Sequence, residues 1–172
     1  MNIKRITSFL SLLLGLILCS ACTSELTVDN SVSGELDLEK YLGTWYEVAR
    51  FDHSFERGMS FCKAEYILRD DGKVDVLNTG MKDGKPKEAK GKAKLTDNPR
   101  ILRVSFFGPF YGDYRIMFLD DDYQWVLVGG SSDDYLWILS RTPKLEDVVR
   151  EAILAEAVRR GYDVSKLIWV EQ

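Results

Sequence analysis

Histidine and cysteine, the residues that most often bind metals or act as nucleophiles, are scarce in this chain of 172 residues. His53 is the single histidine, and a metal site built on imidazole needs several ligands at a regular spacing. A lone histidine in a loop beside Asp52 is more typical of a surface residue than of a catalytic unit. The chain also has no glycine-rich motif for binding phosphate. We therefore predict no catalytic residue, no metal and no cofactor.

Basic residues are also fewer than acidic ones. Lysine and arginine number 23 against 27 acidic residues, which leaves a net charge of −4 at pH 7. Proteins that bind nucleic acid need a basic surface to neutralise phosphates, so nucleic acid is not expected as a partner. Hydrophobic residues make up 45% and charged residues 29% of the chain, a balance typical of one globular domain.

The apolar run near the N-terminus, residues 6–18, is shorter than the roughly 20 residues that a transmembrane helix needs. It follows the basic residues Lys4 and Arg5 and is followed by the small residues Ser20 and Ala21. A short basic segment, an apolar run and small residues in this order are the pattern of a secretory signal peptide. We predict that residues 1–21 form a signal peptide.

The residues around the predicted cleavage site resemble the lipobox of bacterial lipoproteins, in which a cysteine after the cut carries lipid. Here the cysteine is Cys22, and Cys19 stands where the pattern usually has leucine. Thr23 is not acidic, which in such lipoproteins implies sorting to the outer membrane. We predict lipid attachment at Cys22 and a tether over residues 22–38; the alternative is ordinary cleavage that leaves a free thiol. Cys62 is then expected to be a buried small apolar residue.

From residue 44 onward, short runs rich in β-branched and aromatic residues alternate with turn signals. They predict strands over residues 44–51, 61–68, 73–79, 85–95, 101–107, 113–119, 124–129 and 135–141. A helix follows, with Thr142 as N-cap, Pro143 in its first turn and Gly161 at its end, and residues 166–170 form a last strand. Because no helices separate the eight strands, they indicate an antiparallel sandwich or barrel.

Three motifs give the sequence a family resemblance. Gly43-Thr44-Trp45 resembles the Gly-x-Trp signature of lipocalins, Gly112-Asp113-Tyr114 resembles their second motif with glycine for threonine, and Arg141 matches their third. The resemblance is closer still to bacterial outer-membrane lipocalins, relatives of apolipoprotein D. It implies an all-β fold over residues 39–172, an eight-stranded antiparallel up-and-down β-barrel with one C-terminal helix. It also implies a structural role at the closed end of the barrel for the motif residues Gly43, Trp45, Asp113 and Arg141.

Alternation along the strands predicts which side chains face the inside of such a barrel. If Trp45 points inward, then residues 47, 49 and 51 also point inward, barring a β-bulge. On the second strand, Ala64 and Tyr66 share a face with Cys62. A register error of one residue would turn a strand's side chains to the other face. The candidate cavity residues are Ala49, Phe51, Ala64, Tyr66, Phe106 and Tyr114.

The resemblance implies a carrier held on the periplasmic face of the outer membrane by a lipid anchor, which binds lysophospholipid or fatty acid and can form a homodimer. One alternative is an enzyme, for which Glu47 is a candidate if it faces the cavity with a perturbed pKa. Another is an assembly lipoprotein, whose barrel would be filled by large side chains. Residues 104–111 are unusually aromatic and form either a packed barrel corner or an exposed partner surface.

Overall fold

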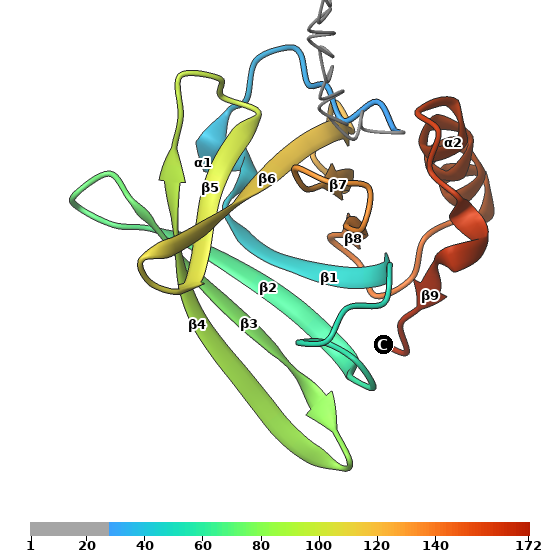
Figure 1. Cartoon of the computed structure of the whole chain (residues 1–172), viewed down its shortest axis with the longest axis horizontal. Coiled ribbons are helices and arrows are strands. Elements are labelled where there is room, and N and C mark those ends of the chain that lie inside the picture. The colour runs from blue at the N-terminus through green and yellow to red at the C-terminus, as the bar shows by residue number, and fades with distance from the viewer. Residues whose placement is uncertain (1–27) are drawn as a thin grey trace, which may run out of the picture.

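The computed structural model describes residues 28–172, and all of their strands belong to one antiparallel β-sheet. Its first eight strands are β1 (Gly43–Arg50), β2 (Ser60–Leu68), β3 (Val74–Lys82), β4 (Lys85–Leu95), β5 (Ile101–Phe107), β6 (Phe110–Leu119), β7 (Trp125–Gly129) and β8 (Leu136–Ser140). Each strand from β2 to β7 pairs with the next one in sequence, β8 pairs with β1, and β1 pairs with β2. The sheet therefore closes on itself, which confirms the predicted up-and-down barrel over a sandwich (Figure 1).

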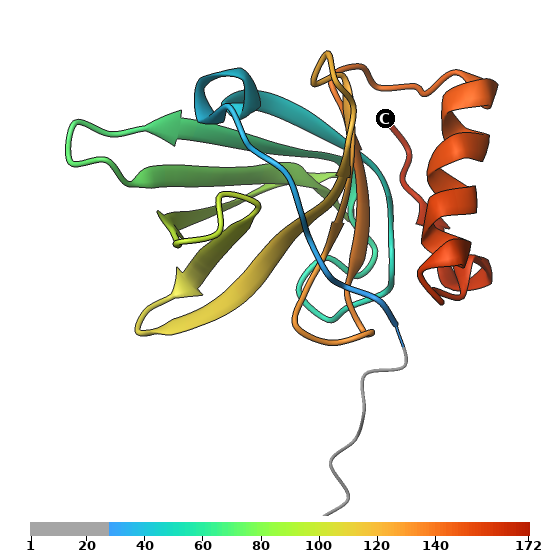
Figure 2. The same cartoon turned by 90° about the horizontal axis from the view of Figure 1, so that it is seen from above.

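Short elements and one longer helix flank the barrel. Helix α1 (Leu38–Tyr41) precedes β1, and α2 (Asp147–Arg159), the 3₁₀ helix η1 (Val164–Lys166) and β9 (Ile168–Trp169) follow β8. Strand β9 pairs with the end of β1, and α2 lies along one side of the barrel (Figure 2). Within residues 28–172, no helix is long and apolar enough to span a membrane.

Two packed cores stabilise this arrangement. One lies inside the barrel and includes Trp45, Leu102 and Ile116. The other lies between the outer face of the sheet and α2, where Ile153 and Ala157 are fully buried. Strands β7 and β8 separate the two cores, so both of their faces are covered and nearly every residue in them is buried. This explains why these two strands are almost continuously hydrophobic rather than alternating.

Helix α2 begins at Asp147, not at Pro143 as the sequence pattern predicted. The Ser140 hydroxyl accepts a hydrogen bond from the Thr142 amide at 3.1 Å, and the Thr142 hydroxyl donates to the Lys144 carbonyl at 2.9 Å. Thr142 therefore stabilises a turn that precedes the helix, because its side chain is used locally. Gly161 follows the helix with a φ of +89°, the left-handed conformation expected there.

The predicted tether over residues 22–38 is docked on the barrel from residue 28 onward. Val28 is buried, and the Asp29 amide donates a hydrogen bond to the carbonyl of Arg160 at 2.8 Å. The Asn30 side chain donates to the carbonyl of Gly130 at 3.0 Å. Val28 and Val32 also pack against the core beneath α2. The hydrogen bonds of this segment leave no periodicity in the sequence. The predicted signal peptide and Cys22 lie outside the described residues.

The closed end of the barrel is built around Trp45 and Arg141. The guanidinium carbon of Arg141 lies 3.8 Å from the centroid of the buried Trp45 ring, a cation–π contact. The Trp45 indole donates to the Tyr41 carbonyl at 2.8 Å. The Arg141 guanidinium also donates to main-chain carbonyls that the strands leave open, those of Lys40, Tyr41, Leu42, Thr44 and Tyr123. One arginine thus joins α1, β1 and the turn before β7.

The other two motif residues support the same barrel in different ways. Gly43 has a φ of +86°, a conformation that side-chain-bearing residues rarely adopt, and this lets the chain turn from α1 into β1. Asp113 on β6 forms ion pairs with Arg115 at 2.9 Å and with Arg103 of β5 at 3.3 Å. Asp113 therefore joins two adjacent strands by charge.

We expect Trp45→Ala to lower the free energy of unfolding by about 3–5 kcal/mol, because it removes a fully buried aromatic ring and leaves a cavity. Urea denaturation measures this loss. Trp169→Ala is the matched control, since its side chain is 48% exposed and its loss should be about 1 kcal/mol or less. Equal losses for the two variants would contradict a central role for Trp45.

Candidate functional site

The interior of the barrel contains a cavity in two connected parts. The first chamber has a volume of about 270 Å³ and is lined mainly by apolar and aromatic residues from six of the eight barrel strands. The second chamber has a volume of about 440 Å³ and extends toward the β5–β6 hairpin. Both are lined by Glu47, Phe55, Glu56, Ala64, Asn78, Val104 and Phe106. An apolar cavity of this size with a few polar groups is typical of a small-molecule site.

Four of the six candidate residues line this cavity: Ala64, Tyr66, Phe106 and Tyr114. The Tyr66 hydroxyl donates to the Tyr114 hydroxyl at 3.0 Å, and Tyr114 is in turn 2.6 Å from the hydroxyl of Tyr41. Burial raises the pKa of all three phenols above their ordinary value, so they remain neutral. The rings of Tyr66 and Tyr114 give the cavity an aromatic wall, and the Tyr41 hydroxyl contacts Tyr114 from outside the cavity lining. That these residues bind a ligand stays a prediction.

The prediction that Ala49 and Phe51 line the cavity is wrong. Glu47 pairs with Leu139 and Ala49 with Ile138, so β1 contains one extra residue between these two pairs. Such a β-bulge reverses the alternation that the strand had before it. Ala49 and Phe51 consequently face the core beneath α2, where the Phe51 ring packs 6.1 Å from that of Tyr162.

The β1–β2 loop contributes polar residues that the sequence analysis missed or misplaced. Glu56 is buried and lines both chambers. Its carboxylate accepts a hydrogen bond from the Trp137 indole at 3.2 Å and lies 3.0 Å from His53 Nε2. His53, predicted at the surface, is instead 7% exposed and stacks on Phe55 at 4.0 Å. Trp137 follows the alternation of β8 and could have been found from it, whereas no periodicity marks Glu56.

Because of the bulge, Arg50 is the residue of β1 that points toward the barrel interior in place of Ala49. Arg50 is 1% exposed and donates hydrogen bonds to the carboxylate of Glu47 and to the carbonyls of Glu56 and Met59. Burial first, and then the negative charge of Glu56, raise the pKa of Glu47 to about 8 despite the neighbouring guanidinium. Glu47 therefore loses its proton less readily than an exposed glutamate does.

Cys62 lies beside this polar cluster and is a free, buried cysteine. Burial raises the pKa of its thiol to about 12, and the sulfur lies 3.7 Å from the carbonyl of Ser60. A thiol that stays protonated is a weak nucleophile. This agrees with the expectation that Cys62 is a small apolar residue of the interior.

The raised pKa of Glu47 predicts how the free energy of unfolding depends on pH. The folded protein keeps this proton up to a pKa of about 8, whereas the ordinary value is 4.5, so stability falls as pH rises between these values. Arg50, Glu56, His53 and Cys62 are the titratable or charged groups around the carboxyl. We expect Glu47→Gln to gain about 1–3 kcal/mol relative to wild type between pH 5 and pH 8, measured by urea denaturation.

Glu156→Gln serves as the control for this experiment. The hydrogen bond from Arg159 lowers the pKa of Glu156 to about 2, with help from Arg160. Its stabilising contribution is therefore complete above pH 4.5 and is lost only as pH falls toward 2. The difference between Glu156→Gln and wild type should be constant from pH 5 to pH 8. A constant difference for Glu47→Gln as well would contradict the raised pKa.

Comparison with known proteins places the fold and the motifs in a family. The family model for a lipocalin-like domain matches residues 36–172. The barrel is similar to the crystal structure of lobster apocrustacyanin A1, with a TM-score of 0.67, 19% identity, and coverage of 79% of each chain. The chain belongs to the lipocalin-like family, as Gly43, Trp45 and Arg141 had indicated.

The similarity in sequence is higher for bacterial relatives. Outer membrane lipoprotein Blc of Escherichia coli K12 is 50% identical over 160 residues, which cover 91% of this chain and 89% of the relative. Apolipoprotein D of Mus musculus is 30% identical over 82% of this chain and 79% of its own. The predicted resemblance to bacterial outer-membrane lipocalins related to apolipoprotein D is therefore confirmed.

Proposed function

We propose that this protein is a non-catalytic carrier that binds a single-chain lipid, a lysophospholipid or a fatty acid, in the barrel cavity. The observation that carries the proposal is the largely apolar cavity in a barrel closed at one end by Trp45 and Arg141. An acyl chain fits such a space because burial of its methylene groups contributes about 0.8 kcal/mol each. The proposal places the ligand between the aromatic wall and the β1–β2 loop.

The two alternatives are less well supported. An assembly lipoprotein without a ligand predicts a filled barrel, whereas the first chamber alone has a volume of about 270 Å³. Glu47 does face the cavity with a raised pKa, which was the criterion for an enzyme. Its shift follows from burial and from Glu56, and buried ion-pair networks produce such shifts without catalysis. Membership of the lipocalin-like family and the lipoprotein names of the relatives favour a binding role.

The carrier is anchored to the outer membrane through lipid on Cys22, facing the periplasm. The lipobox-like residues before Cys22 support this placement, as do the bacterial relatives, which carry the name outer membrane lipoprotein. More than one acyl chain holds a protein on a membrane far more firmly than a single chain does.

A substitution that fills the cavity tests the carrier function. Ala64→Phe adds a ring where Ala64 lines both chambers, and we expect it to weaken binding of a lysophospholipid by about tenfold or more. Ala155→Phe on the exposed side of α2 is the matched control and should bind as wild type does. Native mass spectrometry of the chain from Thr23 onward measures the adduct. A folded wild-type protein that forms no adduct with lysophospholipid or fatty acid would contradict the proposal.

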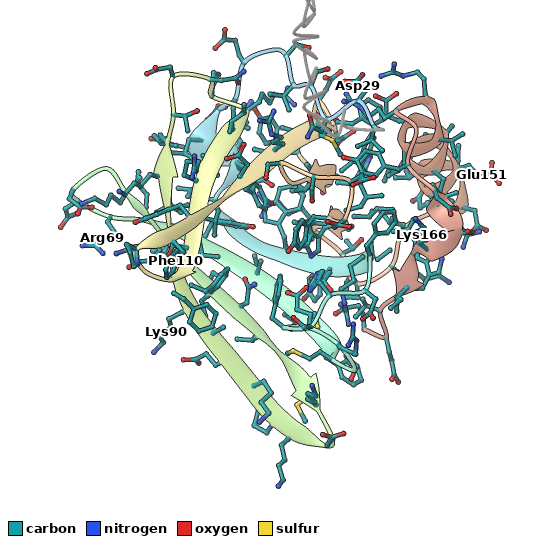
Figure 3. The ribbon with its side chains drawn as sticks, in the orientation of Figure 1. Asp29, Arg69, Lys90, Phe110, Glu151 and Lys166 are labelled. Atoms are coloured by element: carbon teal, nitrogen blue, oxygen red, sulfur yellow. The ribbon has the colours of Figure 1, made fainter. Side chains whose placement is uncertain are left out.

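The protein forms a homodimer through the β5–β6 hairpin. Phe107 and Phe110 flank its turn and are 78% and 79% exposed, so they do not pack into a barrel corner. Figure 3 labels Phe110 on this hairpin. Large exposed aromatic side chains side by side are typical of a partner surface. We expect the double change Phe107→Ser and Phe110→Ser to weaken dimerisation by about tenfold, measured by sedimentation velocity.

The control for the dimer experiment changes equally exposed apolar residues elsewhere. Val148→Ser with Val158→Ser alters α2, where the two side chains are 69% and 56% exposed. This variant should associate as wild type does. A monomeric wild type, or equal weakening by both variants, would count against the hairpin as the interface.

A further inference from the structure

The lysines of this acidic protein are concentrated in one segment. Residues 82–94, from the end of β3 through most of β4, contain six lysines and two acidic residues. This segment therefore has a net charge of +4, and because the whole chain has −4, the remaining residues together carry −8. The overall charge of the chain thus hides a strongly basic segment.

Most of these lysines lack a partner of opposite charge. Among the described residues, only Lys90 of the six forms an ion pair, with Glu88 at 3.1 Å, and both side chains are more than half exposed. An exposed ion pair of this kind contributes little to stability. Lys82 lies directly opposite Lys85 across the turn, and like charges in this arrangement are destabilising. The segment therefore carries positive charge that the rest of the barrel does not neutralise.

Strands β3 and β4 form a two-stranded ribbon that extends beyond the barrel wall (Figure 1). All of β3 pairs with β4, whereas only residues 92–95 of β4 pair with β5. Residues 85–91 consequently form a free edge of the sheet. Lysines and a proline, Pro86, stand along this edge, and such residues discourage pairing with a strand of another protein. The ribbon is therefore not suited to extending the sheet of a partner.

The ribbon presents positive charge on both of its faces. Alternation along β4 places Lys85 and Lys87 on one face and Lys90, Lys92 and Lys94 on the other, and all five are exposed. A folded acidic protein would meet only one of these faces, whereas the head-group layer of a bilayer can surround a projecting ribbon. Anionic lipids attract lysines close to the membrane surface. The distribution of charge therefore favours an anionic bilayer as the partner.

The ribbon also borders the open end of the barrel. Lys82 and Lys87 line the second chamber, so the basic segment reaches the cavity. Because successive strands are antiparallel, the β3–β4 turn and the end of β7 lie at the same end of the barrel. The side chain of Asn30 fixes the N-terminal segment to Gly130, directly after β7. The ribbon and the chain that leads to Cys22 thus stand on opposite sides of one opening.

We propose that the β3–β4 ribbon docks the open end of the barrel on an anionic bilayer, through contacts of Lys85, Lys87 and Lys90 with lipid phosphates. This inference goes beyond the proposed carrier function and needs no ligand in the cavity. The loop after β7 carries Asp133 and Asp134, so the attraction is confined to the ribbon side of the opening. With the anchor on one side and the ribbon on the other, the opening faces the bilayer.

Co-sedimentation with lipid vesicles measures the docking without the anchor. The chain from Thr23 onward is used, since it contains the closed barrel and both packed cores. We expect at least about tenfold tighter binding to vesicles of phosphatidylcholine and phosphatidylglycerol in equal parts than to phosphatidylcholine alone. Raising the salt from about 0.1 M to about 1 M should release the protein, because the screening length falls from about 10 Å to about 3 Å.

The triple change Lys85→Gln, Lys87→Gln and Lys90→Gln tests the assignment to the ribbon. It should weaken binding to the anionic vesicles by about tenfold or more, because it removes three charges that face the lipid. Arginine at the same three positions should bind as wild type does, since the charge is retained. The side chains are exposed, so urea denaturation should give nearly the same midpoint for all three proteins.

A second triple change controls for the overall charge of the protein. Lys40→Gln, Lys144→Gln and Lys166→Gln alter exposed residues away from the ribbon and change the net charge by the same amount (Figure 3 labels Lys90 and Lys166). This variant should bind the anionic vesicles as wild type does. Equal weakening by the two triple changes overturns the proposal, because the attraction would then depend only on net charge.

Two further measurements separate docking from other kinds of binding. Ala64→Phe, which fills the cavity, should dock as wild type does, and its failure to dock would place vesicle binding in the cavity and overturn the proposal. Heparin, a soluble polyanion, should compete only weakly with the vesicles, and equal affinity for heparin would assign the ribbon to a polymer instead. Equal binding to neutral and anionic vesicles also overturns the docking inference, but it leaves the carrier function intact.

Discussion

The barrel depends on a single arginine at its closed end. Where strands and a short helix meet, several carbonyl groups have no sheet partner, and unpaired buried carbonyls are costly. Arg141 satisfies five of them and covers the Trp45 ring at the same time. A guanidinium can do this because its donors spread in one plane while its face remains free to stack. Arg141 and Trp45 close this end of the barrel, and the cavity lies in the rest of the interior.

Much of this structure could be predicted from local patterns. The eight strands and the helix that follows them are predicted by alternation, turn residues and helical spacing, whereas the Trp45–Arg141 contact was implied by the resemblance to lipocalins. Position 49 could not be predicted, because a bulge leaves no mark in the composition of a strand yet reverses every later side chain. Glu56 was equally hidden, since a charged residue in a loop reads as solvent-exposed until tertiary contacts bury it. The docked segment from Val28 was missed because its few apolar contacts, such as Val28 and Val32, are separated by polar residues and its hydrogen bonds leave no pattern in the sequence.

The same bulge explains the unusual polarity of the interior. The bulge turns the apolar residues Ala49 and Phe51 outward, where they pack beneath α2. It also turns Arg50 inward, where it contacts Glu47. The buried guanidinium requires acceptors, and Glu47 and two carbonyls provide them. Buried ion pairs of this kind seldom add net stability relative to apolar packing, whereas removal of one partner is strongly destabilising.

The docked N-terminal segment limits how far the barrel can move from its anchor. Five residues separate Cys22 from Val28, and a fully extended chain of that length reaches only about 20 Å. The Asn30 side chain donates a hydrogen bond to the carbonyl of Gly130, a residue that lines the cavity. With lipid on Cys22, as proposed, this short linker keeps the cavity wall close to the bilayer surface. Such a protein would exchange lipid with its own membrane at short range rather than ferry it across the periplasm.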